Sequence, residues 1–154
     1  MKVGIRKVHE DEWWVEAGCA TVRLNYFEVE LLNILLQEGV RLSEGGEYNL
    51  LAGFIKLAHK LDLLSDEDLQ KVLRAVSDRD LVLMLRALNE GDFRARILRN
   101  VGPLLAKQLE RDLHMDAPLD VEAAKAAIER IMRTAFEMEA RGEIEFQTAV
   151  TEYI

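Results

Sequence analysis

An internal repeat decides the fold of this chain, in the stretch SDEDLQKVLRAVSDRDLVLMLRALNEGDFRARILRNV, residues 65–101. Its units begin at Ser65, Ser77 and Asn89, which gives a period of 12 residues. Each unit opens with a residue type favoured at helix N-caps and carries Asp three positions later. A carboxylate in the first turn suits the free N–H groups and the positive end of the helix dipole. The repeat therefore predicts three short helices.

Helices of two to three turns do not persist alone in water, so these helices must stack side by side. Each unit places an apolar residue one helical turn after its first apolar position, where it can face a neighbouring helix. These residues are Leu73, Leu85 and Ile97. We expect all three to be buried.

Two longer helices are predicted after the repeat. Gly102-Pro103 ends the third short helix and starts a fourth, to about His114, because Pro suits the first helical position. A last helix begins near Asp120 and ends around Gly142, with an apolar stripe that predicts a narrow packing seam. The stripe consists of Val121, Ala124, Ile128, Ile131, Ala135 and Met138. Residues 143–154 are expected to form a loosely ordered tail or a short strand.

Residues 1–64 are predicted to form a small β-ribbon followed by two helices. Residues 3–8 suggest one strand, and Trp13–Val15 and Cys19–Leu24 suggest two more. The third strand alternates apolar and polar residues with a period of two, typical of a strand with two different faces. A ribbon this small is not stable alone and needs an element to pack on.

The first helix of this segment has a clear start signal. Asn25 is expected to be its N-cap with Glu28 as the reciprocal partner, and Gly39 is expected to end it. A second helix is expected from Tyr48 to about Lys60. We therefore place the domain boundary after residue 64.

Composition bounds the function. The chain has 154 residues, 49% hydrophobic and 31% charged, which is typical of a globular protein. Its net charge of −8 argues against nucleic acid as the main partner and against adsorption to anionic lipid. Cys19 is the single cysteine and no stretch has the length of a membrane span, so we expect a cytoplasmic protein without membrane insertion.

The second half of the chain carries an ordered set of short sequence matches. In this order they resemble the C-terminal domain of the flagellar motor switch protein FliG, from about Leu64 to Ile144. The matches are Leu73–Leu81, Leu85-Arg86-Ala87, Leu98–Val101, Ala106–Leu113, Pro118, Val121-Glu122, Ile128, Arg133 and Gly142-Glu143-Ile144. The resemblance implies a mainly α fold in which residues 65–154 form an armadillo-like stack of short helices, while 1–64 have an unknown role.

The resemblance also implies a function. It points to a non-enzymatic protein-interaction module in motility that transmits torque, with flagellar switch or stator components as partners. The alternative is a regulatory or scaffold protein that uses the same helical fold for a non-flagellar partner. The helical repeat also loosely resembles the cytoplasmic N-terminal domain of MgtE-type magnesium transporters.

Charged positions that face the stator in that family can be placed on this sequence. The family's lysine corresponds to Arg86, which keeps the charge, and its early arginine corresponds to Leu104. Its acidic pair corresponds to Arg111 and Asp112, so one sign is reversed and one is kept. A later basic position falls near Asp120, where the sign is opposite.

Charge is unevenly distributed in this half. From Arg86 to Arg111 six basic and three acidic residues give a net +3, whereas residues 112–154 carry four basic and ten acidic residues, a net −6. The basic residues could form a face that steers an acidic partner, or a solvated surface with intrahelical pairs to Glu110. The candidate charged face comprises Arg86, Arg94, Arg96, Arg99, Lys107, Glu110, Arg111 and Asp112.

Two tryptophans stand next to each other in the second predicted strand. Trp13 and Trp14 cannot both point inward, because successive side chains of a strand alternate between its faces. Trp14 is either an exposed aromatic at a binding surface or covered, by the helix of Phe27 to Leu36 or by the C-terminal tail.

Other functions have weaker signals. Residues 21–28 faintly resemble the entry to a winged-helix domain, but the helix where a basic recognition helix would stand carries only Lys56, His59 and Lys60. His9-Glu10-Asp11-Glu12 lacks the paired helical spacing of a zinc site. Cys19 has no partner histidine in a recognisable motif. We expect no nucleic acid, no metal, no cofactor and no catalytic site.

Overall fold

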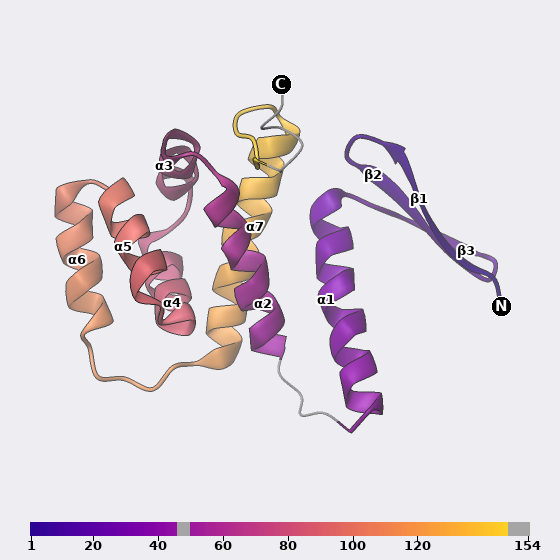
Figure 1. Ribbon diagram of the computed structural model, residues 1–154, viewed down its shortest axis with the longest axis horizontal. Helices are drawn as coiled ribbons and strands as arrows, with labels where there is room; N and C mark the ends of the chain where they lie inside the picture. Colours follow the sequence, from indigo (N-terminus) through magenta and orange to yellow (C-terminus); the bar gives the residue numbers. More distant parts are fainter. Residues whose placement is uncertain (46–49, 148–154) are drawn as a thin grey trace. The chain divides into compact units, whose positions relative to one another are not determined.

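The computed structural model describes residues 1–45 and 50–147, and it is mainly helical with a small N-terminal sheet, as predicted. Packing divides the chain into two compact units, Met1–Leu50 and Leu51–Ile154, called here the N-terminal and C-terminal units. Each unit has its own elements, drawn in Figure 1. The division falls earlier in the chain than the expected boundary after residue 64.

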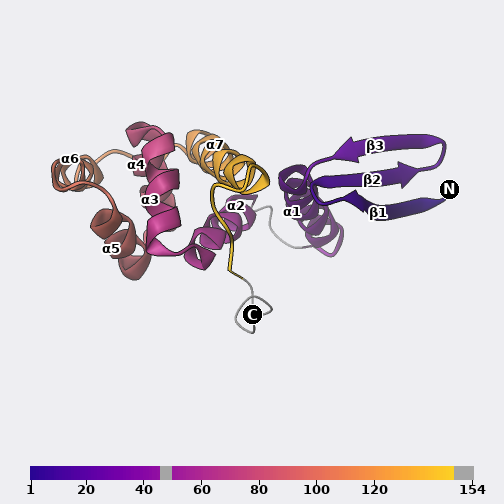
Figure 2. The ribbon, with the colours of Figure 1, turned by 90° about the horizontal axis from the view of Figure 1, so that it is seen from above.

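The N-terminal unit begins with an antiparallel sheet of β1 (Val3–His9), β2 (Glu12–Ala17) and β3 (Ala20–Leu24). Strand β2 lies between the other two, as Figure 2 shows. In this register Trp14 lies opposite Arg6 on one side and Arg23 on the other. The three predicted strands are thereby confirmed, with the second strand extended at both ends.

Helix α1 (Tyr26–Ser43) starts with the predicted capping box. The Asn25 side chain accepts from the backbone N–H of Glu28 at 2.9 Å, and the Glu28 carboxylate accepts from the backbone N–H of Asn25 at 2.8 Å. The expected end at Gly39 is wrong, because α1 continues to Ser43. A lone glycine costs a helix only about 1 kcal/mol and does not end it. The left-handed residue is instead Gly45, at a φ of 84°, just after the helix.

The C-terminal unit is a stack of helices. It contains α2 (Leu50–Ala58), the 3-10 helix η1 (His59–Leu63), α3 (Asp66–Ala75), α4 (Asp78–Leu88), α5 (Gly91–Asn100), α6 (Pro103–Leu113) and α7 (Val121–Ala140). Helix α4 packs against both α6 and α7, so it forms the centre of the stack. The predicted start of the second helix at Tyr48 lies outside the described residues; the structure describes this helix from Leu50, and the last two predicted residues, His59 and Lys60, belong to η1.

The predicted N-caps are confirmed for two of the three repeat helices. Ser65 accepts from the backbone N–H of Asp68, and Ser77 accepts from that of Asp80, both at 3.2 Å. Asn89, expected to cap α5, is the C-cap of α4 instead, with a left-handed φ of 47°. Asparagine serves either role, because its short amide tolerates left-handed backbone and can also accept from N–H groups.

The repeat and the last helix build the core. The predicted core positions of the repeat are buried, and so is the predicted stripe of α7 except Val121, which is 44% exposed in the first turn of the helix. The buried set comprises Leu73, Leu85, Ile97, Ala124, Ile128, Ile131, Ala135 and Met138. The apolar periodicity of the sequence therefore located the core of this unit correctly.

The segment after α7 is fixed rather than loose, up to the end of the described residues at 147. Ile144 and Phe146 are buried, and the backbone N–H of Glu145 donates to the Asp68 carboxylate at 3.1 Å. The backbone N–H of Gln147 donates to the Leu63 carbonyl at 2.8 Å. Residues 143–147 form no strand, and the remainder of the predicted tail lies outside the described residues.

The unit boundary lies near residue 50 because the segment before residue 64 is bonded into the C-terminal unit. Arg96 of α5 donates to the backbone carbonyls of Leu61 and Leu64, at 3.1 and 2.5 Å. Leu57, Leu61 and Leu64 are buried. Helix α2 and η1 are therefore part of the helical stack.

Candidate protein-interaction surface

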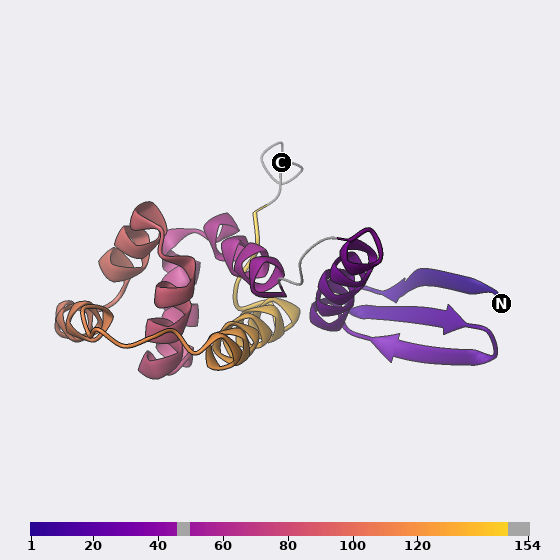
Figure 3. The same cartoon turned by 90° about the horizontal axis from the view of Figure 1, so that it is seen from below.

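Helix α6 presents most of its side chains to solvent. Its one fully enclosed side chain is Leu109, and the helix lies at the outer edge of its unit beside α5, as Figure 3 shows. Leu104 is 79% exposed although it is apolar. Lys107 and Arg111 follow it at spacings of three and four residues, so the three side chains share one face of the helix. We call Leu104, Lys107 and Arg111 the α6 stripe.

The cations of the α6 stripe are not neutralised within the part of the chain that the structure describes. No ion pair joins Lys107 or Arg111 to Glu110, so the intrahelical pairing considered from the sequence does not form there. The side chain of Arg111 donates from Nε to the backbone carbonyl of Lys107 at 3.3 Å. Glu110 is exposed and Asp112 is half-buried. The stripe therefore combines an exposed apolar side chain with two cations beside two acidic groups.

Two other members of the predicted face are partly used by the fold. Arg86 on α4 donates to the backbone carbonyl of Ala117, in the connection between α6 and α7. Arg94 on α5 is half-buried, and its Nη2 donates to the Asn89 side chain at 3.5 Å. The Nε of Arg94 is buried without a hydrogen-bond partner among the described residues. These arginines lie at helix connections and are less available than the α6 stripe.

Arg96 is half-buried, and its guanidinium is turned toward carbonyls and carboxylates of the fold. Besides the carbonyls of Leu61 and Leu64, its guanidinium contacts the carboxylates of Asp62 and Asp66 at 3.6 and 3.4 Å. Carbonyls at the end of a helix have no intrahelical partner and need donors from elsewhere. The role of Arg96 is therefore to cap η1 and join it to α5, which the residue's own sequence neighbourhood does not reveal.

Arg99 is exposed at the C-terminal end of α5. It lines a surface groove of about 490 Å³ together with Arg74 of α3 and residues at the start of α6. Arg99 therefore lies on a different helix from the α6 stripe and lines this groove. The predicted face resolves into the α6 stripe, a groove beside it, and arginines that hold the fold together.

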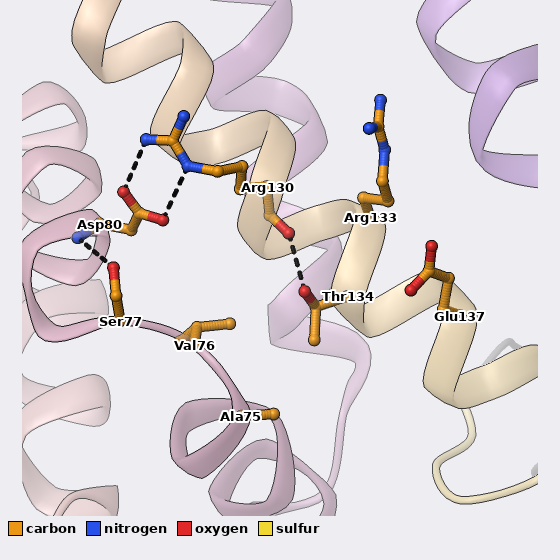
Figure 4. Close-up of a pocket in the computed structure, with 8 residues that line it drawn as sticks. All are labelled: Ala75, Val76, Ser77, Asp80, Arg130, Arg133, Thr134 and Glu137. Atoms are coloured by element: carbon orange, nitrogen blue, oxygen red, sulfur yellow. Dashed lines mark hydrogen bonds and ion pairs between the residues drawn. The ribbon is translucent and has the colours of Figure 1, made fainter.

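A partly buried ion pair that the sequence did not suggest joins two helices. Asp80, in the first turn of α4, faces Arg130 of α7, and the two side chains form paired hydrogen bonds (Figure 4). Arg130 holds the pKa of the Asp80 carboxyl below its ordinary value of 3.8 mainly through these hydrogen bonds. The pair lines a pocket of about 260 Å³ with Arg133 and Glu137, and its tight geometry indicates a structural role.

His59 forms a second polar junction, between η1 and α5. Its Nδ1 lies 2.9 Å from the Asp62 carboxylate, and its Nε2 lies 3.1 Å from that of Glu90. Partial burial lowers the pKa of His59, but hydrogen bonds to Asp62 and Glu90 outweigh this effect and raise the pKa above 6.5. The ring also meets Phe93 edge-on, with centroids 5.4 Å apart.

In the N-terminal unit both tryptophans are half-buried. Trp14 donates from Nε1 to the Glu12 carboxylate at 2.7 Å, and the guanidiniums of Arg6 and Arg23 lie 5.1 and 5.4 Å from its ring centroid. Cation–π contacts of this kind cover an aromatic ring with charge. The Trp14 ring is therefore flanked by two guanidiniums, and its use as a binding surface stays a prediction.

Two features are absent from the described ranges, 1–45 and 50–147. No group of His, Cys, Asp and Glu there has the arrangement to hold a metal ion. Among the same residues, every helix is too short or too polar to traverse a bilayer.

The arrangement defines a stack of short helices with an exposed, charged outer helix, a class of domain suited to contacts with other proteins. The family model described as FliG C-terminal domain matches residues 57–146. The chain therefore belongs to the FliG C-terminal domain family, and its C-terminal unit is a flagellar motor switch type of domain, as the sequence resemblance indicated. No curated protein matches the chain.

Proposed function

We propose that the chain is a non-enzymatic protein-interaction module of the flagellar motor, acting in the cytoplasm and contacting switch or stator components through the α6 stripe. The observation that carries the proposal is the exposure of this stripe on a domain of the FliG family. Leu104 offers apolar area, and Lys107 and Arg111 offer steering charge. The acidic neighbours Glu110 and Asp112 give the surface both signs, which favours one docking orientation over others.

The proposal is tested by capture of partners from motile cells with the tagged full chain. We expect switch or stator components to be recovered with the wild type and lost with Lys107→Glu/Arg111→Glu. The matched control is Lys56→Glu/Arg79→Glu, which changes the net charge equally at two exposed cations of α2 and α4, outside α6. Equal recovery of motor components with both double variants would contradict the assignment to the α6 stripe.

One observation favours a second candidate, a regulatory or scaffold protein with a non-flagellar partner. The resemblance places charged family positions on Leu104 and Arg111, where this chain has lost one charge and reversed another. Electrostatic complementarity selects partners, so altered signs can redirect a surface to a different partner. Recovery of proteins outside the motor, sensitive to Lys107→Glu/Arg111→Glu, would support this candidate over the first.

A further inference from the structure

We propose that the groove between α3, α5 and α6 binds a short acidic, amphipathic segment of a protein partner. The inference rests on the proposed function as an interaction module, but it concerns a different surface from the α6 stripe. It gives this unit two contact sites with different residues, the α6 stripe and the groove.

The shape and lining of the groove suit an apolar side chain. The groove has a volume of about 490 Å³. Its apolar lining consists of Leu73, Val76, Val101 and Leu105. Recognition grooves for amphipathic segments have this composition, because the apolar lining supplies affinity and the rim supplies specificity.

The rim of the groove is positive. Arg74 and Arg99 are both exposed, and among the described residues neither forms a hydrogen bond or an ion pair. Asp78 is the one carboxylate among the lining residues. The N-cap of α6 is Gly102, which has no side chain to accept from the first N–H groups of the helix, so this helix start adds to the positive potential. The charge complement of this rim is a segment with carboxylates on either side of an apolar residue.

The floor of the groove is already ordered. Asn100 is buried, and it accepts from the Gln70 side chain at 3.1 Å. It donates to the Asp66 carboxylate at 3.2 Å and to the Arg96 carbonyl at 2.9 Å. These bonds join the ends of α3 and α5, so a partner does not have to supply the free energy of ordering the groove.

A peptide fits this site better than a nucleic acid. The chain carries a net charge of −8, which opposes the approach of a polyanion. The four apolar lining residues and the absence of an aromatic ring among the residues of this groove also differ from the stacking platforms of single-strand binders.

The test uses the full chain and a short labelled peptide in which Glu residues flank a Leu residue on both sides. Fluorescence anisotropy measures its binding, and amide NMR locates the site. We expect amide shifts at Val101 and Leu105. We expect Arg74→Glu/Arg99→Glu to weaken binding about tenfold, and Arg74→Gln/Arg99→Gln to weaken it less. The control Lys107→Glu/Arg111→Glu should bind the peptide as the wild type does.

Three results would overturn the inference: shifts confined to residues outside the groove, equal binding of a peptide with Lys in place of Glu, or displacement of the peptide by a short single-stranded oligonucleotide. Circular dichroism of each variant confirms that its fold is retained. If the peptide does not bind but motor components are still captured through the α6 stripe, the groove is rejected as a binding site and the proposed function stands. If the peptide binds but no motor component is captured, the groove stands and the proposed function is rejected.

Discussion

Arg130 of α7 donates two hydrogen bonds to the carboxylate of Asp80 in α4, from Nε at 3.0 Å and from Nη2 at 2.8 Å. The Asp80 side chain is 11% exposed, whereas that of Arg130 is 58% exposed. Bidentate contacts of this kind fix the relative position of two groups as well as joining them. The pair therefore ties the central helix of the repeat to the long last helix.

The first prediction concerns the stability of this pair. Asp80→Asn should lower the free energy of unfolding by about 1–2 kcal/mol, because a charge-assisted contact at a mostly buried carboxylate is lost. Urea unfolding followed by circular dichroism measures the change.

Arg130→Met should act in the same direction, and the double variant should be less destabilised than the sum of the single changes. The control is Arg133→Met, one turn further along α7, where the ion pair with Glu129 is half exposed. Additive effects of Asp80→Asn and Arg130→Met would show that the two residues do not interact in solution.

The second prediction concerns acid. The pKa of Asp80 is lowered in the folded state, so its contribution to stability is present above its ordinary value of 3.8 and is lost as the pH falls through the folded pKa. The stability difference between the wild type and Asp80→Asn should therefore shrink on acidification below about pH 4. A difference that stays constant down to about pH 2 would contradict the assignment.

The third prediction has the opposite sign of pH dependence. The pKa of His59 is raised above 6.5 in the folded state, so its contribution is fully present below 6.5 and is lost as the pH rises through the folded pKa. The wild type should exceed His59→Gln in unfolding free energy most clearly near pH 5.5, and the difference should decrease by about pH 8. Glu90→Gln should remove part of this pH dependence, and an unchanged profile in that variant would argue against the contact.

The fourth prediction concerns the left-handed C-cap of α4. Asn89→Val should destabilise the protein by about 1 kcal/mol or more, because a β-branched residue tolerates a φ of 47° poorly. Asn89→Gly should be close to neutral, since glycine adopts this conformation without steric cost. Thermal unfolding of both variants measures the loss of stability. If only Asn89→Val is destabilised, the backbone conformation is responsible; if both variants are destabilised, the amide side chain is required.

The sequence was sufficient for the parts of the fold that depend on local signals. Apolar spacing located the buried positions of the repeat and of the last helix, and the serines at 65 and 77 located two helix starts. Local signals failed where one residue type serves two purposes. Asn89 is a good N-cap and a good left-handed C-cap, and Gly39 is tolerated inside a helix.

The roles of the charged residues depended on tertiary contacts that no spacing reveals. Asp68 and Asp80 occupy equivalent positions of the repeat, yet Asp80 meets Arg130, 50 residues away, while Asp68 accepts from the backbone of Glu145. Arg96 looked like a surface charge from the sequence but is turned toward the carbonyls of η1. Among the basic residues of the predicted face, Arg99, Lys107 and Arg111 are exposed, as expected, and form no ion pair within the described residues.

The central claim is that the α6 stripe contacts a motor component, and photocrosslinking in motile cells tests it most directly. A photoreactive residue would replace Leu104, which is 79% exposed, and in a matched control it would replace Glu122, whose side chain is 82% exposed on α7. We expect crosslinks from position 104 to a switch or stator component. These crosslinks should be lost with Lys107→Glu/Arg111→Glu, and none should form from position 122. The absence of motor crosslinks from position 104, or equal crosslinks from both positions, would contradict it.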